Sequence, residues 1–294
     1  MILIQRGRGK KGKSRFFRHY FRVLSKPGQT RRLLLEELEN RNLLSSSIPL
    51  DTINWTAMGP APILNGQTPR GQPVSGRIAA IAADPNDSNV LYLAAAGGGV
   101  WKTTDAGADW APLTDDQATS FMGALAVAPS ASSVIYAGTG EPSNSNLSFY
   151  GRGVLKSMDG GASWTLLGND VFDRHTIAQI AVSPIDPDTV FVAVADGGVN
   201  GVGGNTGIWK STDGGKTWTD TTSTISTTAA FTDVEMDPKD PKTLYAAVGS
   251  FRGSSVNGVY KTDDGGATWS VAGNFPTGIG DGRISVAIAP ADSQ

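Results

Sequence analysis

The chain's densest group of residues able to bind a ligand lies in residues 138–152, a stretch rich in Gly, Ser and Asn. A carboxylate, two amides, an aromatic ring and a guanidinium occur there within twelve residues: Glu141, Asn144, Asn146, Tyr150 and Arg152. Carboxylates and amides hydrogen-bond sugar hydroxyls or peptide groups, and an aromatic ring supplies an apolar face. We therefore predict a polysaccharide or protein ligand here, with Asp196 and Arg252 contributed by two later loops. A solvated polar loop without function is the alternative.

Other kinds of chemistry lack the residues that they need. The chain has no cysteine and two histidines, so nothing supports a thiolate or histidine metal site. Glycine-rich stretches such as 201–204 are not followed by Lys-Ser or Lys-Thr, as a phosphate-binding loop requires. We therefore predict no metal and no cofactor. We expect His175, which follows Asp173 and Arg174, to be a surface loop residue.

The elements that carry these loops are indicated by a motif that occurs four times. Each copy has Ser or Thr two residues before an Asp, Gly two residues after it and Trp five residues after it: Asp105, Gly107 and Trp110; Asp159, Gly161 and Trp164; Asp213, Gly215 and Trp218; Asp264, Gly266 and Trp269. The aspartates are 54, 54 and 51 residues apart. That period is typical of one four-stranded propeller blade.

Each copy of the motif has the composition of a tight hairpin turn. The Asp and Ser/Thr side chains can accept hydrogen bonds from turn N–H groups, and the glycine before the Trp suits a positive φ. The Trp supplies a large ring to bury, and its N–H needs a partner. We therefore assign the motif a structural role, because carboxylates one blade apart are too distant to form a catalytic pair.

Within each period the sequence predicts four short strands. The first is apolar and ends before a Pro, the second is β-branched and aromatic, the third begins with Gly, and the fourth begins at the Trp. The expected fold is all-β, a β-propeller of four-stranded blades with the aspartate motifs as turns. Its blades are expected within a single domain, 48–294, at about 76–115, 122–168, 177–221 and 231–273, with a fragment at 283–294.

Together these features resemble the Asp-box (BNR) repeat shared by sialidases, family 74 xyloglucanases, sortilin-type receptors and photosystem II assembly factors. The resemblance covers roughly residues 51–294 and implies a complete ring of about seven blades. Residues 54–59 look like a closing strand, and the fifth unit stops early. We therefore expect an incomplete, truncated ring whose open faces favour self-association. A short closed propeller is the alternative.

The first 47 residues differ from the rest in charge: twelve Lys/Arg and three Glu give +9, whereas thirteen Lys/Arg and twenty-four Asp/Glu give −11 over 48–294. Residues 35–45 resemble the LExLExRxLLS element at the start of many exported bacterial proteins. That likeness implies that residues 1–47 are a targeting segment of a secreted or cell-surface protein. The alternative is a disordered basic arm with a short incidental helix.

Two classes of partner are not expected. No apolar run of 18 residues is present, so we predict no transmembrane segment. The acidic body argues against nucleic-acid binding by the basic segment.

The Asp-box repeat occurs in enzymes and in binding proteins, so two functional hypotheses remain. The favoured one is an exported, non-catalytic propeller that binds a glycan or protein through its loop face. The alternative is a glycoside hydrolase, xyloglucanase-like or sialidase-like, which needs two carboxylates about 5–10 Å apart. A family 74 enzyme carries an Asp where this chain has Ala96, and the Arg-Ile-Pro of a sialidase reads Arg77-Ile78-Ala79 here. Both departures favour binding over catalysis.

Overall fold

The computed structural model describes residues 76–142, 149–195, 203–250, 253–273, 278 and 282–289. The described residues form four four-stranded antiparallel sheets and one short helix, α2 (Asn169–Phe172). The predicted all-β architecture of four-stranded blades is confirmed. The N-terminal segment 1–47, the expected closing strand at 54–59 and the residues after 289 lie outside the described part of the chain.

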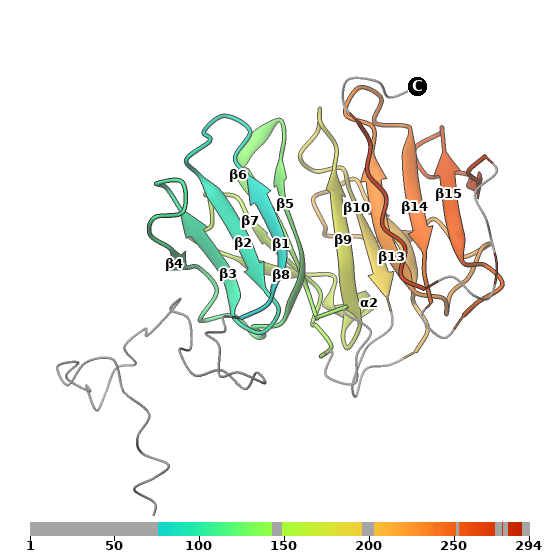
Figure 1. Cartoon of the computed structure of the whole chain (residues 1–294), viewed down its shortest axis with the longest axis horizontal. Coiled ribbons are helices and arrows are strands. Elements are labelled where there is room, and N and C mark those ends of the chain that lie inside the picture. Colours follow the sequence, from blue (N-terminus) through green and yellow to red (C-terminus); the bar gives the residue numbers. More distant parts are fainter. Residues whose placement is uncertain are drawn as a thin grey trace, which may run out of the picture. The chain divides into compact units, whose positions relative to one another are not determined.

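Each sheet is one blade, and its strands pair in chain order (Figure 1). The first blade contains β1 (Ile78–Ala83), β2 (Leu91–Ala95), β3 (Gly99–Thr103) and β4 (Ala111–Pro112). The second contains β5 (Met122–Ala128), β6 (Ala131–Thr139), β7 (Val154–Ser157) and β8 (Thr165–Leu167). The third contains β9 (Thr176–Val182), β10 (Val190–Ala195), β11 (Gly207–Ser211) and β12 (Thr219–Asp220). The fourth contains β13 (Phe231–Met236), β14 (Leu244–Val248), β15 (Gly258–Thr262) and β16 (Ser270–Val271).

A central strand is buried on both faces where its blade lies between two others, as in the third blade. All six residues of β10 are buried. Its side chains alternate, as a strand requires, so that Val190, Val192 and Val194 pack towards the second blade. Phe191, Ala193 and Ala195 pack towards the fourth blade. The continuous apolar run of β10 therefore belongs to a sheet placed between two others.

The hydrophobic core is divided into three clusters, one for each interface between consecutive blades. The first-to-second interface is centred on Tyr92, Leu125 and Ile135, and the second-to-third on Tyr136, Phe172 and Val192. The innermost strands β1, β5, β9 and β13 contact one another in succession. Residues 282–289 form no strand, but they lie along β13, where Thr232 Oγ1 donates to the Ile284 carbonyl at 2.6 Å.

In all four Asp-box turns the Ser or Thr hydroxyl donates to the Asp carboxylate and accepts from the N–H of the glycine two residues after that Asp. In the second blade, Ser157 Oγ donates to Asp159 at 2.8 Å and accepts from the Gly161 N–H at 2.8 Å. The Asp159 carboxylate also accepts from the Ser163 N–H and hydroxyl at 2.8 and 2.5 Å. The Trp164 indole N–H donates to the Gly161 carbonyl at 3.1 Å. One carboxylate and one hydroxyl thus satisfy the polar groups of the turn.

The hydrogen bonds keep the turn aspartates ionised to low pH. The Ser163 hydroxyl is the main cause that lowers the pKa of Asp159 to about 2. In the first blade Asp109 stands at the position of Ser163 and has no hydroxyl, so the pKa of Asp105 is lowered mainly by the Asp109 N–H. A carboxylate whose pKa is lower in the folded state stabilises the fold above its unfolded pKa. The turns therefore lose this contribution as the pH falls from about 4 towards 2.

A second repeated contact shows which end of each blade carries the Asp box. The residue after each Asp-box aspartate donates its N–H to a carbonyl in the turn between the first and second strands or, for Ser133, near the start of the second strand. The distances are 2.8–3.0 Å in all four blades: Ala106 to Asn89, Gly160 to Ser133, Gly214 to Asp188 and Gly265 to Lys242. The Asp boxes and these turns therefore share one end of every blade, which we call the Asp-box end. The connections between the second and third strands, and between blades, lie at the opposite end, the loop end.

Lysines on the third strands join neighbouring blades at the Asp-box end. Lys102 Nζ donates to the Gly160 carbonyl of the next blade at 3.1 Å, and Lys210 Nζ donates to the Gly265 carbonyl at 2.8 Å. Each ammonium also lies 5.2 Å from the centroid of an aromatic ring on the second strand of its own blade, Tyr92 or Phe191. We call this arrangement the interblade lysine contact. It couples a cation–π interaction to a hydrogen bond across the interface.

A prediction follows from the first Asp box, where Ala106 occupies the left-handed region with φ 59° and the other three copies have Gly. A Cβ in that region costs free energy that Gly avoids. We predict that Ala106→Gly raises the free energy of unfolding by about 0.5–1 kcal/mol. The matched Gly160→Ala change should lower it by a similar amount, since a Cβ there meets nothing closer than Lys102 Nζ at 3.5 Å. Urea unfolding measures both, and equal effects of one sign would contradict the argument.

Candidate functional site

Among the ligand-binding residues predicted from the sequence, those that the structure describes lie at the loop end of the second blade. Glu141, Tyr150 and Arg152 lie in the connection between β6 and β7, and the structure describes all three. Asn144, Asn146, Asp196 and Arg252 lie outside the described residues.

Glu141 is buried, with 3% of its surface exposed, rather than presented to solvent. Its carboxylate forms an ion pair with Arg77 at the start of β1, and its N–H donates to the Phe149 carbonyl at 2.8 Å. Glu141 therefore holds the loop of the second blade against the first blade. Arg77 is more accessible to a ligand than Glu141 is, because the Arg77 side chain is 51% exposed.

Two phenylalanines form an aromatic surface beside this ion pair. Phe149 stacks on Phe121 with the ring centroids 4.5 Å apart and the planes 15° from parallel. Phe121 lies in the connection between the first and second blades, so the stack joins two loops. Phe149 is 41% exposed, which is unusual for a large apolar side chain and leaves part of the ring available for contact.

Tyr150 and Arg152 face the connection between the second and third blades. Arg152 Nη1 donates to Asp173 at 2.9 Å, and this bond raises the pKa of the guanidinium. The Arg174 guanidinium lies 5.6 Å from the centroid of the Tyr150 ring. The Arg152–Asp173 pair is about half exposed on each side, so a ligand can compete for either charge.

His175 is buried, so the expectation of a surface loop residue was wrong. Its Nδ1 lies 3.1 Å from the Asp173 carbonyl, and its Nε2 lies 2.5 Å from the Gly204 carbonyl in the long loop of the third blade. The ring thus fixes the connection that carries Asp173. The burial of His175 was not predicted, because its Gly204 partner lies 29 residues later in the chain.

We define the loop-face site as Arg77, Phe121, Phe149, Tyr150, Arg152, Asp173 and Arg174. It combines aromatic rings with paired charges, a composition suited to a ligand that has apolar faces and hydroxyl or amide groups. Sequence reasoning missed Arg77 and Phe121, because only the stacking of the first blade on the second brings them to the loop. In the described part of the chain, no three His, Cys, Asp or Glu side chains are grouped to hold a metal ion.

A pair of carboxylates lies elsewhere, on the innermost strand β13. Asp233 and Glu235 are two residues apart and so lie on one side of the strand, about 7 Å apart along it. Burial and the charge of Asp233 raise the pKa of Glu235 to about 7. Asp233 accepts hydrogen bonds from the Val234 and Val286 N–H groups at 2.9 Å, and Gln179 of β9 donates to Glu235 at 3.2 Å.

Comparison with known proteins finds a matching family model and several similar solved structures. The family model described as "Sortilin, neurotensin receptor 3" matches residues 152–276, which run from β7 to just beyond β16. A crystal structure of an ancestral GH74 enzyme superimposes with a TM-score of 0.52 at 26% identity, covering 68% of this chain and 24% of that one. These matches support the Asp-box β-propeller superfamily that the repeat indicates. A GH74 xyloglucanase structure from Xanthomonas campestris, at a TM-score of 0.50 and 19% identity over 69% of this propeller and 31% of that chain, has the same fold.

The curated relatives of this propeller carry xyloglucanase names. A probable oligoxyloglucan-reducing end-specific xyloglucanase of Neosartorya fischeri is 28% identical over 66% of this chain and 23% of its own length. A xyloglucanase of a Paenibacillus species is 33% identical over 37% of this chain and 11% of its own length. The propeller thus spans about a quarter or less of these relatives. The helix among the described residues, α2, has four residues and is too short to cross a membrane.

The buried carboxylate pair generates a pH prediction. Between pH 4.5 and about 7 the folded state keeps a proton on Glu235 that the unfolded state has released, so stability falls as the pH rises through this window. We predict that Glu235→Gln raises Tm by about 2–4 °C at pH 8 and leaves it nearly unchanged at pH 4.5. Thermal unfolding at both pH values tests this, with exposed Asp263→Asn as the control. An equal effect of Glu235→Gln at the two pH values would contradict it.

Proposed function

We propose that this propeller is an exported protein that binds a xyloglucan-type polysaccharide through the loop-face site. The observation that carries the proposal is the exposed Phe149 ring beside Tyr150 and the Arg152–Asp173 pair, on loops joined across blade boundaries. Aromatic faces stack on sugar rings, while the arginine and carboxylate hydrogen-bond sugar hydroxyls. The xyloglucanase relatives favour this polysaccharide class.

Export supports the same ligand class. A polysaccharide outside the cell does not diffuse across the membrane, so a protein that binds it there must be exported. The basic segment 1–47, with its likeness to an export element at 35–45, would supply the address.

Binding is favoured over hydrolysis by the state of the loop-end carboxylates. Glu141 is buried against Arg77, and Asp173 is paired with Arg152. Ala96, which stands where a family 74 enzyme carries an Asp, follows β2 and donates its N–H to the Arg77 carbonyl at 2.9 Å. The first blade therefore presents no carboxylate at that position.

The binding proposal predicts the effect of a double change, Tyr150→Ala with Arg152→Ala. It should lower affinity for xyloglucan oligosaccharides by about tenfold or more, since a ring and a guanidinium are lost from the site. Tm should stay nearly constant, because exposed ion pairs contribute about 0–1 kcal/mol. Isothermal titration calorimetry and thermal unfolding measure the two quantities.

The matched control is Asp263→Ala, which breaks the exposed Lys261–Asp263 pair of the fourth blade. It should leave affinity unchanged. If the Tyr150/Arg152 double variant binds as tightly as the unchanged protein, the ligand does not bind at the loop-face site. If affinity and stability fall together, the role of that loop is structural.

Glycoside hydrolysis remains the second candidate because of the Asp233–Glu235 pair. A carboxyl group with a pKa of about 7 suits a general acid, and a second carboxyl group lies two residues away on the same side of the strand. If the pair is catalytic, the propeller releases new reducing ends from xyloglucan, and Glu235→Gln and Asp233→Asn each abolish that release. Binding without release of reducing ends would leave the non-catalytic function, and hydrolysis unchanged in both variants would exclude this pair.

A further inference from the structure

The three blade interfaces are built alike at the Asp-box end, with one exception. Three residues after the Asp-box Trp stands Leu113 in the first blade and Leu167 in the second. Each leucine packs on the Asp-box glycine before the next Trp: a Cβ on Gly161 or Gly215 would lie 2.5 or 3.1 Å from the leucine Cδ1. At the third interface the equivalent residue is Thr221, which is smaller and polar.

Where Thr221 stands in place of a leucine, the neighbouring Trp269 has a different hydrogen-bond acceptor. In the first three Asp boxes the indole N–H donates to a glycine carbonyl of its own turn, at 2.9–3.2 Å. In the fourth box the Trp269 indole N–H instead donates to Thr221 Oγ1 of the third blade, at 3.2 Å. The apolar contact between leucine and the Asp box is thus replaced by a hydrogen bond between blades.

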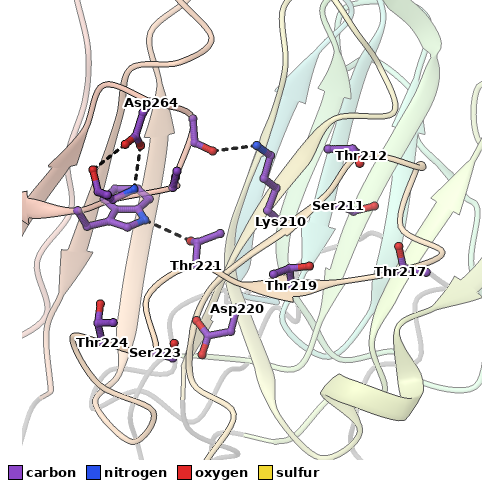
Figure 2. Close-up of a pocket in the computed structure, with 15 residues that line it drawn as sticks. Lys210, Ser211, Thr212, Thr217, Thr219, Asp220, Thr221, Ser223, Thr224 and Asp264 are labelled. Atoms are coloured by element: carbon purple, nitrogen blue, oxygen red, sulfur yellow. Dashed lines mark hydrogen bonds between the residues drawn. The ribbon is translucent and has the colours of Figure 1, made fainter.

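A pocket of about 510 Å³ lies at this interface (Figure 2). Its size falls within the range of about 300–1,000 Å³ typical of small-molecule sites. Trp269 supplies an aromatic wall, and the rest of the lining is dominated by hydroxyls and carboxylates, among them Thr212, Thr217, Thr219, Thr221, Ser223, Thr224, Asp220 and Asp264.

Several of these polar groups are available to a ligand. The hydroxyls of Thr212, Thr219, Ser223 and Thr224 make no hydrogen bond to any residue that the structure describes. Asp220 Oδ1 accepts from the Thr222 N–H and hydroxyl at 2.8 and 3.2 Å, and the Ser223 N–H also donates to the carboxylate. A carboxylate has about four acceptor positions, so the Asp220 side chain can still accept from a bound molecule. Figure 2 shows Asp220, Ser223 and Thr224 together on one side of the pocket.

The charges of the pocket exclude two kinds of occupant. Lys210 is held by the Gly265 carbonyl and the Phe191 ring, so it does not offset Asp220 and Asp264 for an anionic ligand. Asp264 already accepts hydrogen bonds from Thr262 and Thr268, so few lone pairs remain for a metal ion. A neutral molecule with many hydroxyls fits both restrictions.

We propose that the pocket between the third and fourth blades binds a neutral sugar residue, with Trp269 as its apolar wall and Asp220 as a hydrogen-bond acceptor. The pocket runs from the Asp box of the fourth blade along β12 to the first residues of the connection between the third and fourth blades, and it shares no residue with the loop-face site. It is therefore a second site, and its existence does not depend on the function proposed for the first.

The test uses Thr221→Leu, which places at the third interface the residue found at the other two. Full-length protein is titrated with methyl β-glucoside, methyl β-xyloside and methyl β-galactoside while the Trp269 indole N–H is followed by NMR, assigned through Trp269→Phe. We expect a saturable shift with at least one sugar and a dissociation constant in about the millimolar range. Thr221→Leu should weaken binding by about tenfold or more and keep the protein folded.

Two further variants keep the proposal testable if Thr221→Leu fails to fold. Asp220→Asn should weaken binding by about fivefold or more, and the Tyr150/Arg152 double variant should leave it unchanged. The proposal is overturned if the Trp269 signal does not respond to any of the three sugars. It is also overturned if Asp220→Asn and a folded Thr221→Leu bind as tightly as the unchanged protein.

Discussion

Everything in this structure depends on the burial of blade faces against neighbouring blades. A single four-stranded sheet has too few residues to bury its own apolar side chains, so its stability comes from the interfaces. The strand β10 illustrates the constraint: its valines belong to one interface core, and Phe191 with its alanines belongs to the next. The Asp boxes and the interblade lysine contact hold those interfaces in register.

The same stacking builds the loop-face site. Glu141 reaches Arg77 of the first blade, Phe149 stacks on Phe121 between blades, and Arg152 pairs with Asp173 beyond the second blade. No single loop contains the site. Its geometry is therefore as rigid as the interfaces beneath it, which suits recognition of an extended polymer without a large entropic cost.

The sequence was sufficient for the architecture and insufficient for the contacts. The spacing of the Asp-box aspartates predicts blades, and the apolar, β-branched and aromatic runs within each period predict strands. Glu141 was predicted to face a ligand, yet its partner Arg77 lies 64 residues earlier in the chain and meets it only after the blades stack. The pocket beside Thr221 was not predicted either, because its lining residues come from two blades and meet only across their interface.

The central claim, that a polysaccharide binds across the loops of the second and third blades, is tested most directly by hydrogen exchange. Amide exchange of the full chain is compared with and without xyloglucan oligosaccharides. The account predicts slower exchange at 149–153 and 170–175 and unchanged exchange in the Asp-box turns of the first and second blades. Unchanged exchange at 149–153 and 170–175 in the presence of a bound oligosaccharide would contradict it.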